Sequence, residues 1–496
     1  MAASGSLKRN LGLWSIVGLG LGYMTPTVVF DTFGIVSGET DGAVPSAYLI
    51  ALIVMIFTAF SYGKMVRVFP TAGSAYTYTR ETMSPGLGFL VGWTSLMDYL
   101  LLPMVNCLIA RLYMESLVPD APAWVWVVLY TIIMTGIVTS SMRGTANFNA
   151  VLLIFAVTMV ALFCVLAIVN LTNGEGSGLV FSSEPFVHEG VQLSALLTGA
   201  TVVCFSFIGF DAVTMYTNEA KHISIMPKAI MLTVVSGGAI FLIASYFAQQ
   251  LFPDNSQFTI VDDPLPEIGF LTGGHLFQGF FLAAAFAATV ASGLASHASV
   301  SRMLLVMGRN GVLPRKAFGY INPKTHTPVF NIVLVGAVCL LAMSFSLELI
   351  SALINFGALI AFTFVNLTVI AHYAFRTRQV VDLKTTFDYV IMPAIGAILT
   401  GVLWVSLHKT ALVGGIIWLT IGIIYLAVMT RGFRRSVRSF DDPEADAQMS
   451  EPEVPEAGAE APEAGVEAPE AFEASGPEVP EASGPESPEP GSSVRD

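Results

Sequence analysis

Hydrophobic residues along the chain gather into long runs, and short segments between the runs carry most polar and charged residues. A helix of about 20 residues rises roughly 30 Å, which is the thickness of the hydrocarbon core of a bilayer. Such a helix also satisfies its own backbone hydrogen bonds, as a bilayer requires. The pattern predicts twelve transmembrane spans: 11–38, 44–68, 85–118, 122–142, 146–170, 193–218, 228–252, 275–306, 327–345, 348–373, 388–407 and 410–430.

Composition supports this interpretation. The chain is 54% hydrophobic and only 12% charged, with a mean hydropathy of +0.70, whereas an average soluble domain is about 25% charged. The first span contains Gly and Pro, and no A-x-A-like site follows it. We therefore expect no cleavable signal peptide. The predicted fold class is an all-α polytopic membrane protein.

The C-terminal segment differs in kind from the rest. Residues 441–496 hold 17 acidic residues and one arginine in a Pro-Glu-Ala repeat, whereas residues 1–440 hold 22 basic and 19 acidic residues. The net charge of −13 therefore comes from the tail. Such a segment has too few bulky apolar residues to form a core. We predict a disordered acidic tail over 431–496, and the tail says nothing about substrate.

Charge placement predicts the orientation of the spans. With the N-terminal segment 1–10 in the cytoplasm, the inner loops collect nearly all basic residues and the outer loops hold Lys409 alone. The outer loops instead carry acids such as Glu39, Asp41 and Glu175. This asymmetry is what the positive-inside rule describes. We expect a multi-pass protein of the inner (plasma) membrane with both termini in the cytoplasm.

Sequence motifs of enzymes are missing from the chain. It contains no H-E-x-x-H, no G-x-S-x-G and no G-x-x-x-x-G-K pattern. The four cysteines all fall in predicted spans, without metal-ligand spacing or a disulfide framework. We expect a protein that is not an enzyme and needs no metal or cofactor. Its expected partners are a small-molecule substrate, protons and the lipid bilayer, with no nucleic acid.

Two predicted spans are interrupted by helix-breaking residues. The first reads GLGLGYMTPTVVFDTFG, with Pro26 near its middle, and the sixth reads VVCFSFIGFDAVTMYTNEA, with Ser206 and Gly209 before an acid. Glycine and proline in membrane helices often serve packing alone. Matched breaks in corresponding spans, however, indicate a midplane binding site in an inverted-repeat transporter. We predict a five-plus-five repeat over 11–192 and 193–387, followed by two extra helices over 388–430.

Three acidic residues lie well inside predicted spans: Asp31, Asp98 and Asp211. A charged side chain at mid-helix costs about 2.5–3.5 kcal/mol on insertion scales, so such residues need a function or a partner. No Lys or Arg lies at similar depth, and Arg111 is placed to pair with Glu115 one turn away. Uncompensated acids should hold protons or bind a cation. Asp98, about 20 Å along the third span, lies near the midplane.

Each candidate also has an ordinary structural explanation. Asp211 could cap the second half of its broken helix. Asp31 could bond Thr27 or Thr32 beside it. Tyr99 offers a ring and a hydroxyl to a cation, but it could equally be an interhelical tyrosine.

Several segments resemble the amino acid–polyamine–organocation (APC) transporter family. The sixth span and its exit, residues 205–230, read FSFIGFDAVTMYTNEAKHISIMPKAI. Residues 62–93 read YGKMVRVFPTAGSAYTYTRETMSPGLGFLVGW and resemble the family pattern F-P-x-A-G-x-x-Y-x-Y followed by G-W. The loop after the eighth span, residues 301–328, is similar to the same family. The resemblance covers about residues 11–430 and implies an alternating-access transporter.

Four further segments resemble the branch of bacterial putrescine importers. They read GLGYMTPTVVFDTFGIVSGETDGAVPSAYL (20–49), DYLLLPMVN (98–106), ASGLASHASVSRMLLVMGR (291–309) and INFGALIAFTFVNL (354–367). This resemblance implies a polyamine as substrate.

The resemblance also indicates where the chain departs from its relatives. Relatives that carry amino acids have a Gly-Ser-Gly break in span one, whose N–H groups take the substrate carboxylate, whereas Pro26, Thr27 and Val28 stand here. Proline has no N–H, so the departure favours a substrate without a carboxylate. Phe205 aligns with an aromatic that occludes the site in relatives, although it could simply pack. Some relatives carry a coupling lysine in span five, but 146–170 contain no charged residue.

We therefore predict a secondary transporter that imports a small organic cation, putrescine in the first instance, by proton symport. The predicted substrate-binding residues come from both breaks and from span three: Tyr23, Met24, Thr25, Pro26, Thr27, Asp31, Asp98, Tyr99, Phe205, Ser206, Phe207, Ile208, Gly209 and Asp211. The proton-coupling candidates are Asp31, Asp98, Asp211 and His297, although such a histidine is often a packing residue.

Two other classes of function remain open at this stage. An amino acid permease or an amine exchanger could carry the same fold. A sensor or channel could be built on a transporter scaffold, but a sensor should carry a folded output domain. Paired broken helices favour a transporter over a channel.

Overall fold

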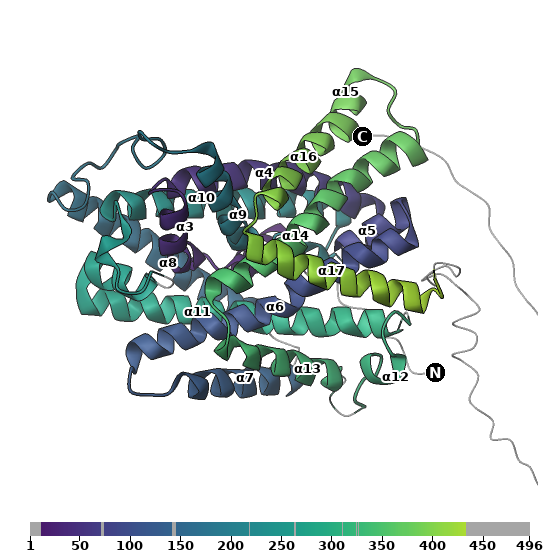
Figure 1. The fold of residues 1–496 in the computed structure, drawn as a ribbon, viewed down its shortest axis with the longest axis horizontal. Coiled ribbons are helices and arrows are strands. Elements are labelled where there is room, and N and C mark those ends of the chain that lie inside the picture. Colours follow the sequence, from purple (N-terminus) through teal and green to yellow (C-terminus); the bar gives the residue numbers. More distant parts are fainter. Residues whose placement is uncertain are drawn as a thin grey trace, which may run out of the picture. The chain divides into compact units, whose positions relative to one another are not determined.

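The computed structural model describes residues 11–70, 74–140, 145–217, 219–261, 264–309, 311–323, 325 and 327–432. The predicted N-terminal segment 1–10 and all but the first two residues of the predicted tail 431–496 lie outside these residues. The described part is helical and contains no β-strand, only an isolated bridge between Leu11 and Ala220. The predicted all-α class is confirmed (Figure 1).

Eleven helical segments of the described chain are long and apolar enough to cross a membrane. They are built from α1–α2 (Leu13–Met24, Val28–Asp31), α4 (Val44–Val68), α6 (Pro85–Leu117), α7 (Ala123–Ser140), α8 (Thr145–Thr172), α9–η1 (Leu193–Phe207, Ala212–Tyr216), η2–α10 (Ile223–Ile225, Met226–Leu251), α11 (Leu265–Arg309), α14–η5 (Leu347–Ile370, Ala371–Arg376), α15–η6–α16 (Leu383–Thr386, Phe387–Ile391, Met392–Val405) and α17 (Lys409–Met429).

The predicted ninth span corresponds to a shorter apolar segment, α13 (Val329–Cys339) continued by η4 (Leu340–Met343). The predicted count of twelve crossings therefore stays a prediction. Four short elements connect the longer ones: α3 (Phe33–Glu39), α5 (Ser74–Thr82), η3 (Asn255–Gln257) and α12 (Arg315–Phe318). Within α11 the backbone turns at Gly274, where φ is +72° and ψ is −173°.

The first predicted break is present between α1 and α2. α1 ends at Met24, and Thr25 adopts a left-handed conformation with φ of 52°. Pro26 follows and has no N–H to continue the ladder of helical hydrogen bonds. The chain becomes helical again at Val28. A proline after a left-handed residue is a common way to end a helix.

The second predicted break is present between α9 and η1. α9 ends at Phe207, Ile208 is extended, and Gly209 has a φ of +116°. That φ is rarely adopted by residues with a side chain. A Cβ on Gly209 would also lie 2.4 Å from Cδ1 of Tyr23. The second break therefore packs directly against the end of α1, and the two breaks lie together.

Corresponding spans of the two predicted repeats pack on each other. α4 packs along α10, α6 packs along α11, and α1 contacts η1. Two inverted repeats related by a two-fold axis would produce this pairing, and the repeat boundaries stay a prediction.

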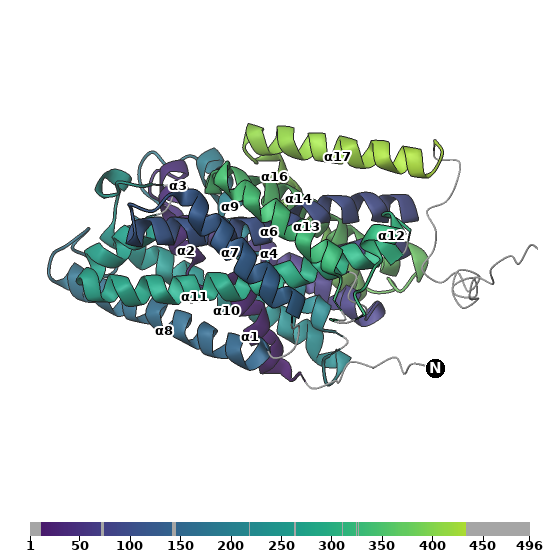
Figure 2. The same ribbon diagram turned by 90° about the horizontal axis from the view of Figure 1, so that it is seen from below.

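Apolar side chains cover the outer faces of the peripheral helices. Figure 2 shows α17 and α8 at opposite edges of the helix bundle. Ile154 on α8 and Val413 on α17 are both largely exposed. A bilayer would cover such faces, since lipid tails are as apolar as these side chains. By contrast, α6 is the most buried of the long helices.

Candidate functional site

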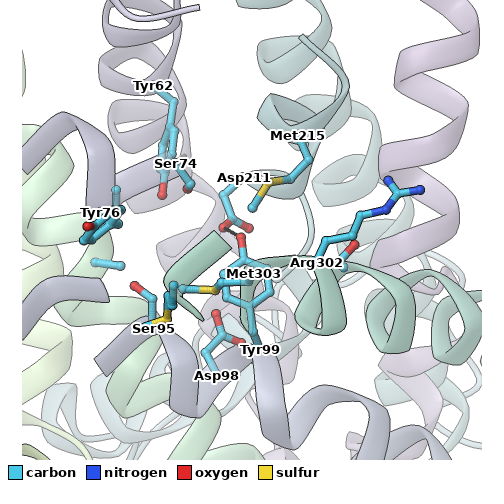
Figure 3. Close-up of a pocket in the computed structure, with 14 residues that line it drawn as sticks. Tyr62, Ser74, Tyr76, Ser95, Asp98, Tyr99, Asp211, Met215, Arg302 and Met303 are labelled. Atoms are coloured by element: carbon cyan, nitrogen blue, oxygen red, sulfur yellow. Dashed lines mark hydrogen bonds between the residues drawn. The ribbon is translucent and has the colours of Figure 1, made fainter. Parts of the chain in front are cut away.

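A cavity of about 130 Å³ contains two of the three predicted membrane acids (Figure 3). It lies toward the beginning of α6 and the end of α11, on the side that the charge pattern assigns to the cytoplasm. Its lining residues come from α4, α5, α6, the second break with η1, α11 and α14: Tyr62, Ser74, Ala75, Tyr76, Ser95, Asp98, Tyr99, Asp211, Met215, Ser299, Arg302, Met303, Met307 and Ala361.

α6 supplies the first acid. The helix begins at Pro85, and the side chain of Ser84 accepts a hydrogen bond from the N–H of Leu87 as a cap. Proline at the first helical position and serine before it are both typical of a helix N-terminus. Asp98 and Tyr99 come more than three helical turns after Pro85. Both residues line the cavity.

The second acid comes from the second break. Asp211 follows Gly209 by two residues, and its carboxylate accepts hydrogen bonds from the Tyr99 hydroxyl at 3.0 Å and from the Gly209 N–H at 3.4 Å. Figure 3 shows the Tyr99–Asp211 bond, with Asp98 on the other side of Tyr99. Tyr99 therefore joins an unbroken helix to the broken one at the wall of the cavity.

The two carboxylates are buried in a largely apolar setting. Asp98 is 4% exposed and Asp211 5% exposed, and Oδ1 of Asp98 has no hydrogen-bond partner. α14 approaches so closely that a Cβ on Gly357 would lie 2.5 Å from the carbonyl oxygen of Thr94. Two acids in a low-dielectric site repel each other when both are ionised. A cation or a proton between them would remove that repulsion.

Arg302 of α11 also lines this cavity. Its side chain is exposed, and in Figure 3 its guanidinium lies away from Asp98 and Asp211. No hydrogen bond or ion pair joins Arg302 to either acid in the part of the chain that the structure describes. The carboxylates therefore keep room for an external cation.

The remaining wall of the cavity is aromatic and apolar. Tyr62 and Tyr76 supply rings, and Met215, Met303 and Met307 supply thioethers. Aromatic faces attract ammonium groups, and methionine adapts to flexible methylene chains. The lining therefore suits a ligand with an amine and an aliphatic stem.

A smaller cavity, about 20 Å³ in volume, lies further along α6 and contains five other predicted residues. These are Tyr23, Met24 and Thr25 from the first break, and Phe205 and Ile208 from the second. The hydroxyl of Ser292 on α11 donates to the Tyr23 carbonyl at 3.1 Å. One unwound carbonyl is thus already satisfied, and the space is too small for a substrate.

Asp31 lies apart from both cavities. It is 0% exposed, and its Oδ1 accepts a hydrogen bond from the hydroxyl of Tyr113 on α6 at 2.5 Å, while Oδ2 has no partner. Neither Thr27 nor Thr32 bonds its carboxylate. The Thr32 hydroxyl donates instead to the carbonyl of Val28.

The other predicted residues occupy structural positions. The hydroxyls of Ser206 and Tyr48 are 3.0 Å apart and share a hydrogen bond. His297 is buried, with Nε2 at 2.9 Å from the Ile332 carbonyl. Besides Asp31 and His297, five predicted residues of the two breaks line neither of the two cavities on α6: Pro26, Thr27, Ser206, Phe207 and Gly209. The backbone of these five residues belongs to the two helix breaks or to the turns next to them.

Sequence reasoning missed several residues of this site. Ser95 precedes Asp98 by three residues, so helical spacing could have found it. The same helical spacing of three or four residues relates Ser299 on α11 to Arg302 and Met303. Tyr62, Ser74 and Tyr76 had no local signal, because only packing brings α4 and α5 to the cavity. Tyr113 is likewise a partner that only the tertiary fold reveals.

Two broken helices that meet beside a buried acidic cavity define a membrane transporter, and comparison with known families identifies its kind. The family model described as amino acid permease matches residues 15–429. The chain therefore belongs to the amino acid permease family, within the APC superfamily. The predictions of a polytopic membrane protein and of a transporter rather than an enzyme are confirmed.

Individual relatives refine this assignment. The chain is 47% identical over 437 residues to the low-affinity putrescine importer PlaP of Escherichia coli, covering 88% of this chain and 97% of the relative. It is 25% identical to the methylthioribose transporter of Bacillus subtilis, covering 86% and 95%. It is also 25% identical to the branched-chain amino acid permease BcaP of Bacillus subtilis, covering 86% and 94%.

The ion pair that the sequence predicts between Arg111 and Glu115 is also present. Arg111 Nε lies 3.7 Å from Glu115 Oε1, and Arg111 Nη1 donates to the Ala342 carbonyl at 3.2 Å. This prediction is confirmed, and the nearest basic residue beyond Asp98 on α6 is therefore engaged elsewhere.

Proposed function

We propose that this protein imports a small organic cation, putrescine in the first instance, across the inner membrane by proton symport. One observation carries the proposal: Asp98 and Asp211 line one buried cavity, and no basic side chain bonds either of them among the described residues. Likeness to a putrescine importer along 88% of the chain supports the same substrate class.

Amine recognition follows from the cavity lining. One ammonium group of the diamine would lie between the carboxylates of Asp98 and Asp211, where it offsets their repulsion and satisfies the free oxygen of Asp98. The butyl stem would pack against the methionines. The second ammonium would lie toward the rings of Tyr62 and Tyr76, which stabilise a cation by about 0.5–2 kcal/mol.

The first break is unfavourable for a carboxylate. Pro26 has no N–H, and the N–H of Val28 donates to the Thr25 carbonyl at 2.9 Å. An amino acid substrate would need such groups free for its carboxylate. This arrangement favours a diamine over an amino acid, in agreement with the acidic cavity.

Transport would proceed by alternating access. The half-helices α2 and η1 can move relative to α1 and α9, because the breaks at 25–27 and 208–209 interrupt the helical hydrogen bonds. With both termini in the cytoplasm, the larger cavity faces inward. Each positive charge moved inward gains about 2.3 kcal/mol per 100 mV of inside-negative potential.

The test is uptake of labelled putrescine into proteoliposomes that contain the full chain, under an imposed inward pH gradient. We expect saturable uptake that collapses with a protonophore and that excess arginine or glutamate does not reduce. Uptake that does not saturate would indicate a channel. Transport of an amino acid with no putrescine uptake would contradict the proposal and would show that the Pro26 argument is wrong.

A further inference from the structure

We propose that Asp31 and Tyr113 form a separate proton site, so that the amine and the coupled proton are held by different acids at two depths of the membrane. This inference rests on the proposed function. The sequence offered all three acids both for substrate binding and for proton coupling, and this inference assigns one role to each: Asp98 and Asp211 bind the amine, Asp31 carries the proton, and Tyr113 positions Asp31.

One face of α6 connects the sites. Residues at alternating spacings of four and three form a single stripe along a helix. On α6 this stripe runs through Ser95, Tyr99, Leu102, Asn106, Ile109 and Tyr113. Ser95 and Tyr99 line the larger cavity, and the next three residues line the smaller one. Tyr113 at the far end bonds Asp31.

The stripe gives the separation between the acids. Tyr113 lies fifteen positions beyond Asp98 along α6, which corresponds to about 22 Å of helix. The smaller cavity lies between the two levels, walled by Phe205 and Ile208. Its volume of about 20 Å³ excludes a diamine. Substrate in the larger cavity therefore cannot reach Asp31 in this conformation.

The surroundings of Asp31 suit a proton rather than an amine. The titratable side chains that face it are Tyr113 from α6 and Tyr48 from α4. α9, which packs on α2, carries the buried Cys204. Most charged residues of α3, α10 and α11 occupy the end turns of those helices: Glu39, Lys228, Glu267 and Arg309. The exception is Arg302, which lies at the larger cavity, about two turns before the end of α11.

The neutral titratable residues of the same helices lie elsewhere. His297 of α11 bonds the Ile332 carbonyl, and Tyr246 of α10 bonds Val180 and Ser182 in the loop after α8. His275 follows the turn of α11, and its ring is tilted at 43° against that of Phe270, with centroids 4.6 Å apart. No described cation neutralises Asp31, so its buried carboxyl is stable in the membrane only with a proton on it.

Symport requires separate binding sites for the amine and the proton. An ammonium and a proton that compete for the same carboxylates would replace each other, and such competition couples the two in opposite directions. Co-transport needs both bound at once. Of the three buried acids in the described part of the chain, Asp31 is the one that the amine cavity does not include.

The coupled proton binds to and leaves from a single oxygen, Oδ2 of Asp31. In an outward-open state, an external hydronium transfers its proton to Oδ2 of Asp31, which changes the carboxylate from −1 to neutral. Closure of α2 against α6 then gives the Tyr113 contact seen here. In the inward-open state, the O–H bond breaks and the proton passes to water on the cytoplasmic side, which leaves the carboxylate charged.

The experiment compares two assays on reconstituted full-length protein. Counterflow at equal pH reports putrescine binding and exchange, and acceleration by an inward pH gradient reports proton coupling. We expect D31N to keep counterflow and lose the acceleration, because asparagine imitates the neutral acid. D98N should lose counterflow. D41N, a matched change at an exposed acid in the turn after α3, should behave as wild type.

The second variant is Y113F. Its phenyl ring keeps the packing but removes the hydroxyl that stabilises the charged carboxylate. We expect the pH of half-maximal uptake to rise by about one unit, which a merely structural role would not produce. This variant decides the question if D31N does not fold, and an unchanged pH profile would overturn the inference.

The remaining outcomes separate this inference from the proposed function. No putrescine counterflow by the wild type would overturn both. Wild-type counterflow together with an undiminished pH-gradient acceleration in D31N would overturn only the assignment of Asp31. Loss of counterflow in a D31N protein with normal thermal stability would place Asp31 in the substrate site. That result would also overturn the assignment of Asp31 as the proton site.

Discussion

Asp98 shows how a single residue can combine burial, charge and an unsatisfied atom. Its carboxylate is 4% exposed, and one oxygen has no hydrogen-bond partner. A buried polar atom without a partner costs about 1–3 kcal/mol, and more when it is charged. Bound substrate can recover that cost, whereas a purely structural acid would have a partner in the fold.

The first prediction concerns this charge. Asp98→Asn should raise the KM for putrescine at least about 30-fold, because losing one partner of a buried charge pair costs about 2–5 kcal/mol. Concentration-dependent uptake in proteoliposomes measures the effect. Asp254→Asn, which changes an exposed acid outside the spans, serves as the control. A KM within twofold of wild type would mean that Asp98 does not contact the amine.

Residue-level prediction from the sequence was uneven for physical reasons. Asp98 and Asp211 could be found because an acid in an apolar span is conspicuous and costly, and Tyr99 could be found because it adjoins Asp98. Tyr76 and Ser74 could not, since tyrosine and serine are common and only the fold brings α5 to the cavity. The same holds for Tyr113, which lies fifteen residues from Asp98 on the same helix.

At the scale of elements, α17 is attached to α6 by a reciprocal tryptophan pair. Trp93 Nε1 donates to the Trp418 carbonyl at 2.9 Å, and Trp418 Nε1 donates to the Trp93 carbonyl at 2.8 Å. Their rings stack with centroids 4.9 Å apart. A Cβ on Gly422 would lie 2.4 Å from Trp93 Cδ1, so the helices are in close contact. The pair stabilises the helix that carries Asp98.

The second prediction tests this pair. Trp418→Phe removes one hydrogen bond and part of the stacked area, which should cost about 1–2 kcal/mol of stability. The thermal unfolding midpoint of detergent-solubilised protein should fall, with the KM for putrescine unchanged. Trp124→Phe on the exposed face of α7 is the matched control. An unchanged midpoint would show that α17 adds nothing to the stability of α6.

The two breaks show what elements can be predicted from the sequence. Pro26 and Gly209 marked both breaks correctly, because each residue acts on its own backbone. The sequence did not show that the breaks touch each other through Gly209 and Tyr23, nor that α11 begins before its predicted start with a turn at Gly274. Such contacts depend on neighbouring elements.

At the scale of the whole molecule, orientation decides which way the cavity faces. The basic residues of the loops predict that the segment between α14 and α15 is cytoplasmic and that the loop between α8 and α9 is external. The third prediction follows from this asymmetry. A membrane-impermeant maleimide should label Ser183→Cys in intact cells and label Gln379→Cys only after the membrane is permeabilised.

Both positions are exposed, whereas native Cys107, Cys204 and Cys339 are buried and Cys164 is half-buried in its span. The wild type therefore controls for background labelling. Labelling with the opposite sidedness would mean that the protein has the inverted orientation in the membrane. The larger cavity would then face the outside. The import direction would then need a different explanation.

The sequence by itself determined the helical class, eleven of the apolar spans, the two breaks, and the presence of acids that need a cation or proton. These properties follow from local physics: hydrophobic length, backbone chemistry and the cost of a charge in lipid. Only the tertiary structure decided that Asp98 and Asp211 share a cavity while Asp31 lies beside Tyr113. The depth and partner of each acid depend on how distant helices pack, and residue spacing within one span does not contain that information.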